Sequence, residues 1–232
     1  MNTAAVILAL SWLTPAVDAL WARPLGGRGL LARVIDNCRD SGVCDAPLVL
    51  TDAPTLLAAK ETLPVRVLAC PDGLRGHPFN FLALEQPTLS REFDLTLQAG
   101  IPADLTFFLP WNRPFLDGPV LEKMYHTLLE DPLTARLVPV TPVNPQLLAK
   151  VEGAADFYPV WMQKGLDRQL APQLLRPAGE ACLTHWSRLL RGIPKIAGIR
   201  FDAVRTFGVG EAADCALADT LDASLTAGEV RP

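Results

Sequence analysis

Charged and amide side chains that could bind an anionic ligand occur where predicted strands end. Asp52 follows the apolar segment 47–51, and Asn112 and Arg113 follow the apolar segment 105–109. Arginine binds carboxylates and phosphates through parallel hydrogen bonds, and amide side chains both donate and accept. The candidate substrate-binding residues of the chain are Arg28, Asp52, Asn112, Arg113, Arg168 and Gln169.

Each of the arginines also has a purely structural interpretation. Arg28 is at the start of a predicted helix, where a solvated charge is common. Arg113 is close to Trp111, so it could bind an anion or simply pack on the indole ring. The pair Arg168 and Gln169 could bind a carboxylate of a ligand or partner subunit, or could hold an interface together.

The cysteines and histidines do not form a metal-binding or catalytic pattern. The five cysteines are an odd number without a C-x-x-C pair, and the three histidines are widely scattered. Both observations argue against a zinc site and a disulfide framework. We therefore predict no metal ligands and no catalytic residue, and we interpret the cysteines as small thiols in a reducing cytoplasm.

The composition favours a single globular domain over residues 1–232. Half of the residues are hydrophobic and a fifth are charged, with a net charge of -4. A mildly acidic chain without a basic run is not expected to bind nucleic acid or an anionic membrane. The apolar segment 4–13 has no Lys or Arg before it and is too short to span a bilayer, so we predict a buried strand and a cytoplasmic protein.

The first third of the chain alternates between predicted strands and helices. Continuous apolar runs at 4–10, 47–51 and 65–69 are typical of parallel strands covered on both faces. Helices are predicted between them, over 30–41 and from Asp52, which we expect to cap a helix, to Lys60. Strand–helix–strand order predicts right-handed crossovers and a mostly parallel sheet.

The rest of the chain continues this order with one interruption. Pro139 lies within one of the predicted strands, which either weakens the prediction of a strand there or places that strand at an edge of the sheet. Residues 143–180 lose the alternation, and we predict an inserted arm there. The whole pattern predicts a three-layer α/β/α fold. The predicted strands are 105–109, 136–141 and 197–201, and the predicted helices are 89–99, 119–130, 184–191 and 211–225.

Four strings in this order resemble the CMP-N-acetylneuraminate synthetase branch of the cytidylyltransferases. They are R-P-L-G-G-R-G-L-L at 23–31, L-T-D at 50–52, R-Q-L-A-P at 168–172 with Gly179, and F-G-V-G-E-A-A-D-C-A-L-A at 207–218. The resemblance implies a Rossmann-like, nucleotide-diphospho-sugar-transferase-like fold. It also implies transfer of CMP from CTP to an acidic sugar with Mg²⁺, and a homodimer joined through the arm.

The sequence departs from the resembled family in the loop after the first strand. The family's A-R-G-G-S-K string falls on residues 10–15, so its glycines correspond to Trp12 and Leu13 and its lysine to Pro15. Bulky side chains hinder the approach of a phosphate to the backbone, and proline has no N–H to offer. The residues in the nucleotide position are Ser11, Trp12, Thr14 and Trp21.

The acidic residues that bind Mg²⁺ in the resembled family are also absent. Its I-D-x-D string falls on residues 207–210, where Gly208 and Gly210 replace the aspartates, and the Asn of its N-G pair is Ala178. Two hypotheses about the function remain. One is a non-catalytic relative that serves as a binding or scaffold subunit, without a cofactor. The other is an active, divergent transferase that uses CTP, Mg²⁺ and an acidic sugar.

We also predict that the arm forms a homodimer interface. Its aromatic and apolar residues suit an interface core, although they could pack on their own sheet instead. They are Phe157, Tyr158, Val160, Trp161 and Met162.

Overall fold

The computed structural model describes residues 1–76, 79, 91–94, 96, 103–142, 148–150, 157–159, 175–193 and 195–227. The helix predicted over 89–99 lies partly outside these residues; 91–94 and 96 are helical. Within the described ranges, no helix is both long and apolar enough to cross a membrane.

The first half of the sheet is parallel, as predicted. Strand β1 (Thr3–Ala9) pairs with β4 (Ala46–Thr51) on one side and with β6 (Leu105–Pro110) on the other, and β5 (Arg66–Ala69) pairs with β4. Every residue of β1 is buried, which explains its continuous apolar sequence. Helices α2 (Leu30–Asp40) and α3 (Pro54–Ala58) make the connections.

The second half of the sheet is mixed, and a strand that the pattern did not predict lies inside it. Strand β11 (Cys182–His185) runs antiparallel between β6 and β7 (Thr134–Pro142). Thr184 therefore belongs to a strand, and α6 (Trp186–Leu190) begins after it. Strand β7 also pairs in parallel with β12 (Lys195–Arg200), on the side away from β11, and its end pairs antiparallel with β10 (Leu175–Pro177). The edge position predicted from Pro139 is therefore wrong.

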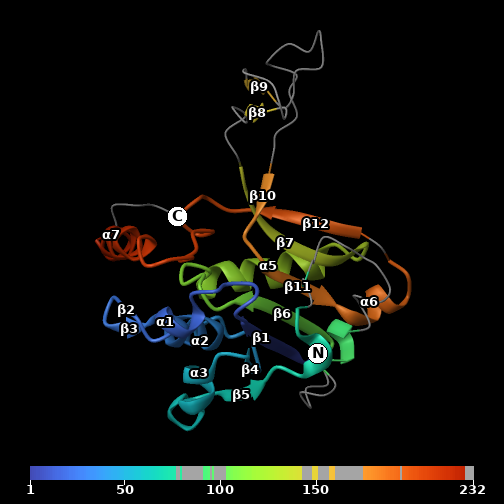
Figure 1. The fold of residues 1–232 in the computed structure, drawn as a ribbon. Coiled ribbons are helices and arrows are strands. Elements are labelled where there is room, and N and C mark those ends of the chain that lie inside the picture. Colours follow the sequence, from blue (N-terminus) through green and yellow to red (C-terminus); the bar gives the residue numbers. More distant parts are fainter. Residues whose placement is uncertain are drawn as a thin grey trace.

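Apolar side chains on both faces of the sheet form two hydrophobic clusters, which gives the predicted three-layer fold (Figure 1). One cluster contains buried residues of α2, α5 (Gly118–Glu130) and α7 (Asp214–Thr226). The other contains buried residues of α6 and of the turn η2 (Asp72–Leu74). The remaining short elements are α1 (Val17–Leu20), β2 (Pro24–Leu25), β3 (Arg28–Gly29) and η1 (Lys60–Thr62).

The predicted arm contains a small antiparallel pair of its own. Strands β8 (Leu148–Lys150) and β9 (Phe157–Pro159) pair with each other apart from the main sheet (Figure 1). Val160, Trp161 and Met162 lie outside the described residues, and so do Arg168 and Gln169. The homodimer therefore stays a prediction.

A buried ion pair joins the strand β7 to the helical segment 91–94. Arg136 and Glu92 are both completely buried, with Nη2 2.6 Å from Oε2, and Arg136 Nε donates to Thr184 Oγ1 at 3.0 Å. Burial raises the pKa of Glu92, and the Arg136 guanidinium opposes this shift. A buried pair of this kind is costly to break, because removing one partner leaves the other charge in the protein interior.

We expect the substitution Arg136→Met to lower the free energy of unfolding by about 3–5 kcal/mol at pH 7. Without the guanidinium, the folded-state pKa of Glu92 rises further above its unfolded value, so the variant should be more stable at pH 5 than at pH 7. Urea denaturation at both pH values measures this. The double variant with Glu92→Leu is the control, and it should recover most of the loss; an equal or larger loss would contradict a coupled pair.

Candidate functional site

The carboxyl ends of the parallel strands β1, β4 and β6 meet at one edge of the sheet. In open α/β sheets this edge is where ligands usually bind. The segment 10–21 follows β1, Asp52 follows β4, and Asn112 and Arg113 follow β6. Most of the residues that the sequence singled out are therefore gathered at this edge.

Ser11 and Asp52 form a closed contact between the ends of β1 and β4. The Ser11 backbone N–H donates to Asp52 Oδ1 at 2.7 Å, and the Ser11 hydroxyl donates to Asp52 Oδ2. Thr51 adds a further link, because its hydroxyl donates to the Ala9 carbonyl oxygen at 2.8 Å. The prediction that Asp52 caps α3 is therefore wrong. The N-cap of this helix is Ala53, and no side chain in the described part of the chain caps it.

The loop after β1 is bonded to itself. The N–H groups of Leu13 and Thr14 both donate to the Leu10 carbonyl oxygen, at 3.1 and 3.0 Å. The N–H of Val17 donates to the Thr14 carbonyl oxygen at 3.1 Å and begins the short helix α1. A phosphate-binding loop needs several N–H groups that point together at one anion. Here the N–H groups of Ser11, Leu13, Thr14 and Val17 are all bonded within the protein.

The two tryptophans of this loop pack on opposite faces of the sheet. Trp12 packs against the cluster that contains Leu8 and Leu10, and Trp21 packs against the cluster that contains Val17. The indole N–H of Trp21 donates to Thr55 Oγ1 at 3.0 Å. The two side chains therefore do not fill one common pocket, and each anchors the loop to a different core.

A second contact ties the same loop to α3. The Asp18 carboxylate accepts from the Thr55 hydroxyl at 2.7 Å and from the Thr55 N–H at 3.1 Å. Sequence reasoning missed this pair, because the two residues are 37 positions apart. The loop after β1 is thus held at Asp52 and at Thr55, on both sides of the start of α3.

Asn112 and Arg113 hold the segment that leads into α7. The Asn112 side-chain amide donates to the Val209 carbonyl oxygen at 3.0 Å, and the Val209 N–H donates to the Asn112 carbonyl oxygen at 2.9 Å. Arg113 Nη1 donates to the Thr206 carbonyl oxygen. Both side chains that were candidates for ligand binding are thus bonded to the backbone of residues 206–209.

The Arg113 guanidinium lies directly against two glycines. A Cβ atom built on Gly208 would be 2.6 Å from Arg113 Cζ, and one built on Gly179 would be 3.1 Å from Nη2. Burial lowers the pKa of Arg113, and the Glu180 carboxylate opposes this shift. Arg113 Nε is buried and has no hydrogen-bond partner among the residues that the structure describes. The absence of a side chain at residue 208 is therefore what makes room for the guanidinium.

Arg28 is a surface charge. Its guanidinium bonds the Asp36 carboxylate through Nη2 at 2.6 Å and Nε at 3.0 Å, and its side chain is 63% exposed. An exposed pair of this kind contributes little to stability. The pair lies between β3 and α2.

The Mg²⁺ that the sequence resemblance implies does not fit the residues at this edge. The aspartate positions of the resembled string are Gly208 and Gly210, and a guanidinium lies against the first of them. The Asp52 carboxylate is bonded to Ser11 through both oxygens. Among the residues that the structure describes, no group of three or more His, Cys, Asp or Glu side chains could hold a metal ion.

No protein-family model and no curated protein sequence matches this chain. Several solved structures, however, are similar to it. A CMP:2-keto-3-deoxy-manno-octonic acid synthetase complexed with CTP aligns over 99% of this chain and 100% of its own, with a TM-score of 0.65 and 14% identity. A 4-diphosphocytidyl-2C-methyl-D-erythritol synthase aligns over 95% and 98%, with a TM-score of 0.63 and 14% identity.

A third similar structure is the 2-C-methyl-D-erythritol 4-phosphate cytidylyltransferase from Thermus thermophilus. It aligns over 95% of this chain and 98% of its own, with a TM-score of 0.58 and 17% identity. At such identities the likeness concerns the fold. The chain therefore has the α/β fold of the cytidylyltransferases, with a mostly parallel mixed sheet like that of the nucleotide-diphospho-sugar transferases.

Proposed function

We propose that this protein keeps the cytidylyltransferase fold without nucleotidyl transfer and acts as a non-catalytic binding or scaffold subunit. The observation that carries the proposal is the loop after β1. Its N–H groups at Ser11, Leu13 and Thr14 are bonded internally, and Pro15 has none. A triphosphate that entered this edge would have to break these bonds before it could be bound.

The electrostatics of the edge support the same proposal. Nucleotidyl transfer requires that charge building up on the α-phosphate and the leaving pyrophosphate be neutralised by cations placed in advance. The guanidinium that follows β6, that of Arg113, is engaged with the Thr206 carbonyl oxygen. Asp52, the acidic residue at the end of β4, is engaged with Ser11. Each 1.4 kcal/mol of lost stabilisation slows such a reaction about tenfold.

The alternative proposal is an active, divergent transferase that moves CMP from CTP to an acidic sugar. It depends on Arg168 and Gln169, which match the R-Q string of the resembled family and lie outside the described residues. The two proposals differ in whether CTP binds at all, so one measurement can decide between them.

The experiment is a calorimetric titration of the purified protein with CTP in the presence of MgCl₂. We expect no heat of binding up to about 1 mM CTP, which corresponds to a binding free energy weaker than about -4 kcal/mol. Titration without MgCl₂, and with ATP in place of CTP, are the controls. Micromolar binding of CTP that requires Mg²⁺ would overturn the scaffold proposal in favour of the transferase.

The contact between Arg113 and Gly208 yields a second prediction. In Gly208→Ala, the new Cβ must displace the guanidinium from the Thr206 carbonyl oxygen, so the free energy of unfolding should fall by about 1–3 kcal/mol. Gly210→Ala is the matched control: its Cβ would meet its nearest neighbour, Asp214 Oδ2, at an ordinary 3.5 Å, so we expect a change within about 0.5 kcal/mol.

A double-mutant cycle separates this contact from a general effect on the backbone. In an Arg113→Met background no guanidinium fills the space, so Gly208→Ala should cost much less than it does in the wild type. Thermal and urea unfolding of the four proteins measure the coupling. Equal costs in both backgrounds would show that Gly208 is needed for some reason other than Arg113.

A further inference from the structure

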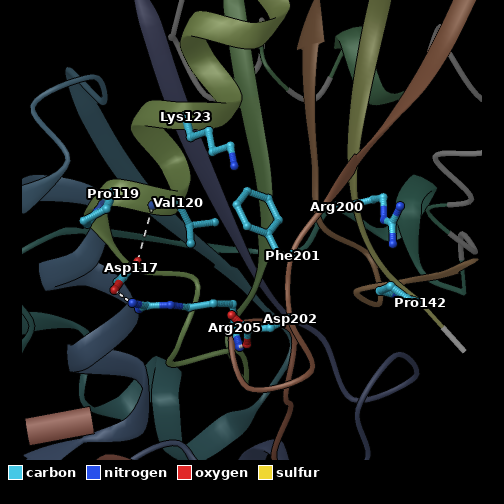
Figure 2. Close-up of a pocket in the computed structure, with 9 residues that line it drawn as sticks. All are labelled: Asp117, Pro119, Val120, Lys123, Pro142, Arg200, Phe201, Asp202 and Arg205. Carbon is cyan, nitrogen blue, oxygen red and sulfur yellow. Dashed lines mark hydrogen bonds and ion pairs between the residues drawn. The ribbon is translucent and has the colours of Figure 1, made fainter. Parts of the chain in front are cut away.

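A pocket of about 480 Å³ lies away from the Ser11 loop, between α5, the ends of β7 and β12, and the segment after β12 (Figure 2). Pockets of this volume commonly hold small organic molecules. Its apolar lining consists of Pro119, Val120, Pro142 and Phe201, and its charged lining consists of Asp117, Lys123, Arg200, Asp202 and Arg205.

Two of the charged residues neutralise each other and serve the fold. Arg205 forms an ion pair with Asp117, and the Asp117 side chain accepts from the Val120 N–H at 3.3 Å at the start of α5. Figure 2 shows the Arg205 side chain reaching the Asp117 carboxylate, and both residues line the pocket. This pair anchors the segment after β12 to α5 and closes one end of the pocket.

The other two cations have no acidic partner in the described part of the chain. Neither Lys123 nor Arg200 has a carboxylate within salt-bridge distance there, and both are exposed. Lys123 Nζ instead lies 5.4 Å from the centre of the Phe201 ring, and Figure 2 shows its side chain descending from α5 toward this ring. Figure 2 shows the Arg200 side chain pointing away from Lys123 and from the Phe201 ring. The pocket therefore combines an aromatic surface and one adjacent cation, Lys123, with a second cation, Arg200, elsewhere on its lining.

Asp202 is the remaining charge, and it limits what the pocket can hold. Its Oδ1 accepts from the Arg205 N–H at 2.8 Å. With the Arg205–Asp117 pair neutral, Lys123 and Arg200 together exceed Asp202 by one positive charge. A ligand with one or two negative charges complements this lining better than a polyanion such as a triphosphate.

We propose that this pocket binds a small organic anion: a carboxylate or phosphate group for Lys123, on a planar or apolar body that packs against Phe201. The Phe201 ring, Val120 and the two prolines supply apolar surface for the body, Lys123 binds the charged group, and Arg200 adds positive charge to the lining. The site is separate from the Ser11 loop. It therefore stands whether or not the protein binds CTP.

Simple aromatic probes test the proposal by NMR titration of the ¹⁵N-labelled protein. We expect benzoate or phenyl phosphate to shift the amide signals of α5 and of residues 200–205, and the tighter of the two identifies the preferred anion. Benzyl alcohol and benzylamine are the neutral and cationic controls, and each should bind at least about fivefold more weakly. Equal binding of benzyl alcohol would overturn the proposal, and so would an absence of shifts at about 10 mM of either anion.

Charge variants make the test specific to this pocket. Lys123→Met should weaken binding of the preferred anion about fivefold, and Arg200→Gln should weaken it less, because Arg200 points away from Phe201 and acts through its charge alone. Asp202→Asn should tighten binding, because the amide keeps the acceptor for the Arg205 N–H and loses the repulsion. Arg66→Gln on β5, at the opposite edge of the sheet, should leave binding unchanged. Unfolding curves verify that each variant is folded. Weakening by Arg66→Gln equal to that by Lys123→Met would reduce the effect to net charge and refute the site.

Discussion

Strand β1 pairs with β4 on one side and β6 on the other, and the rest of the molecule depends on this pairing. All seven of its residues are buried, so helices or turns must cover both faces of the sheet. Its parallel register brings the residues after Ala9, Thr51 and Pro110 to one edge. The contact of Ser11 with Asp52 follows from the register of β1 and β4, and it decides which groups at that edge stay available for a ligand.

At that edge, the polar groups named above form hydrogen bonds within the protein. The N–H groups of Ser11, Leu13, Thr14 and Val17 bond to the loop's own carbonyl oxygens or to Asp52, and the two tryptophans of the loop anchor it to both cores. Arg113 and Gly208 are fitted to each other in the same way, since a side chain at residue 208 would collide with the guanidinium. The polar groups that a ligand at this edge would need are therefore bonded within the protein.

In the pocket beside α5, by contrast, some charged side chains are exposed and form no ion pair within the described residues. One ion pair, Arg205 with Asp117, closes one end of the pocket, while Lys123 remains exposed beside the Phe201 ring and Arg200 is exposed elsewhere on the lining. The segment after β12 connects the two regions, because residues 200–202 and 205 line the pocket, and Thr206 and Val209 bond to Arg113 and Asn112. A ligand in this pocket would therefore act on the same segment that packs against the edge where β1, β4 and β6 end.

Local patterns in the sequence were enough to predict the parallel half of the sheet. Buried strands such as β1 and β4 are continuous apolar runs, and α2 and α5 have helical periodicity, so their identity depends on nearby residues alone. The same is true of the loop after β1, whose lack of glycine and lysine is visible in the sequence. The resemblance to cytidylyltransferases in four short strings agrees with the fold likeness of the solved structures.

Only the tertiary structure decided where β11 lies, what Asp52 and Arg113 bind, and that a pocket lies beside α5. Strand β11 is four residues long and is held by pairing on both sides, so its own sequence contains too little signal. The Asp52 carboxylate could cap a helix or bond across to Ser11, and the register of β1 against β4 selects the second. Lys123, Arg200 and Arg205 come from separate elements, and only packing brings their charges to one cavity.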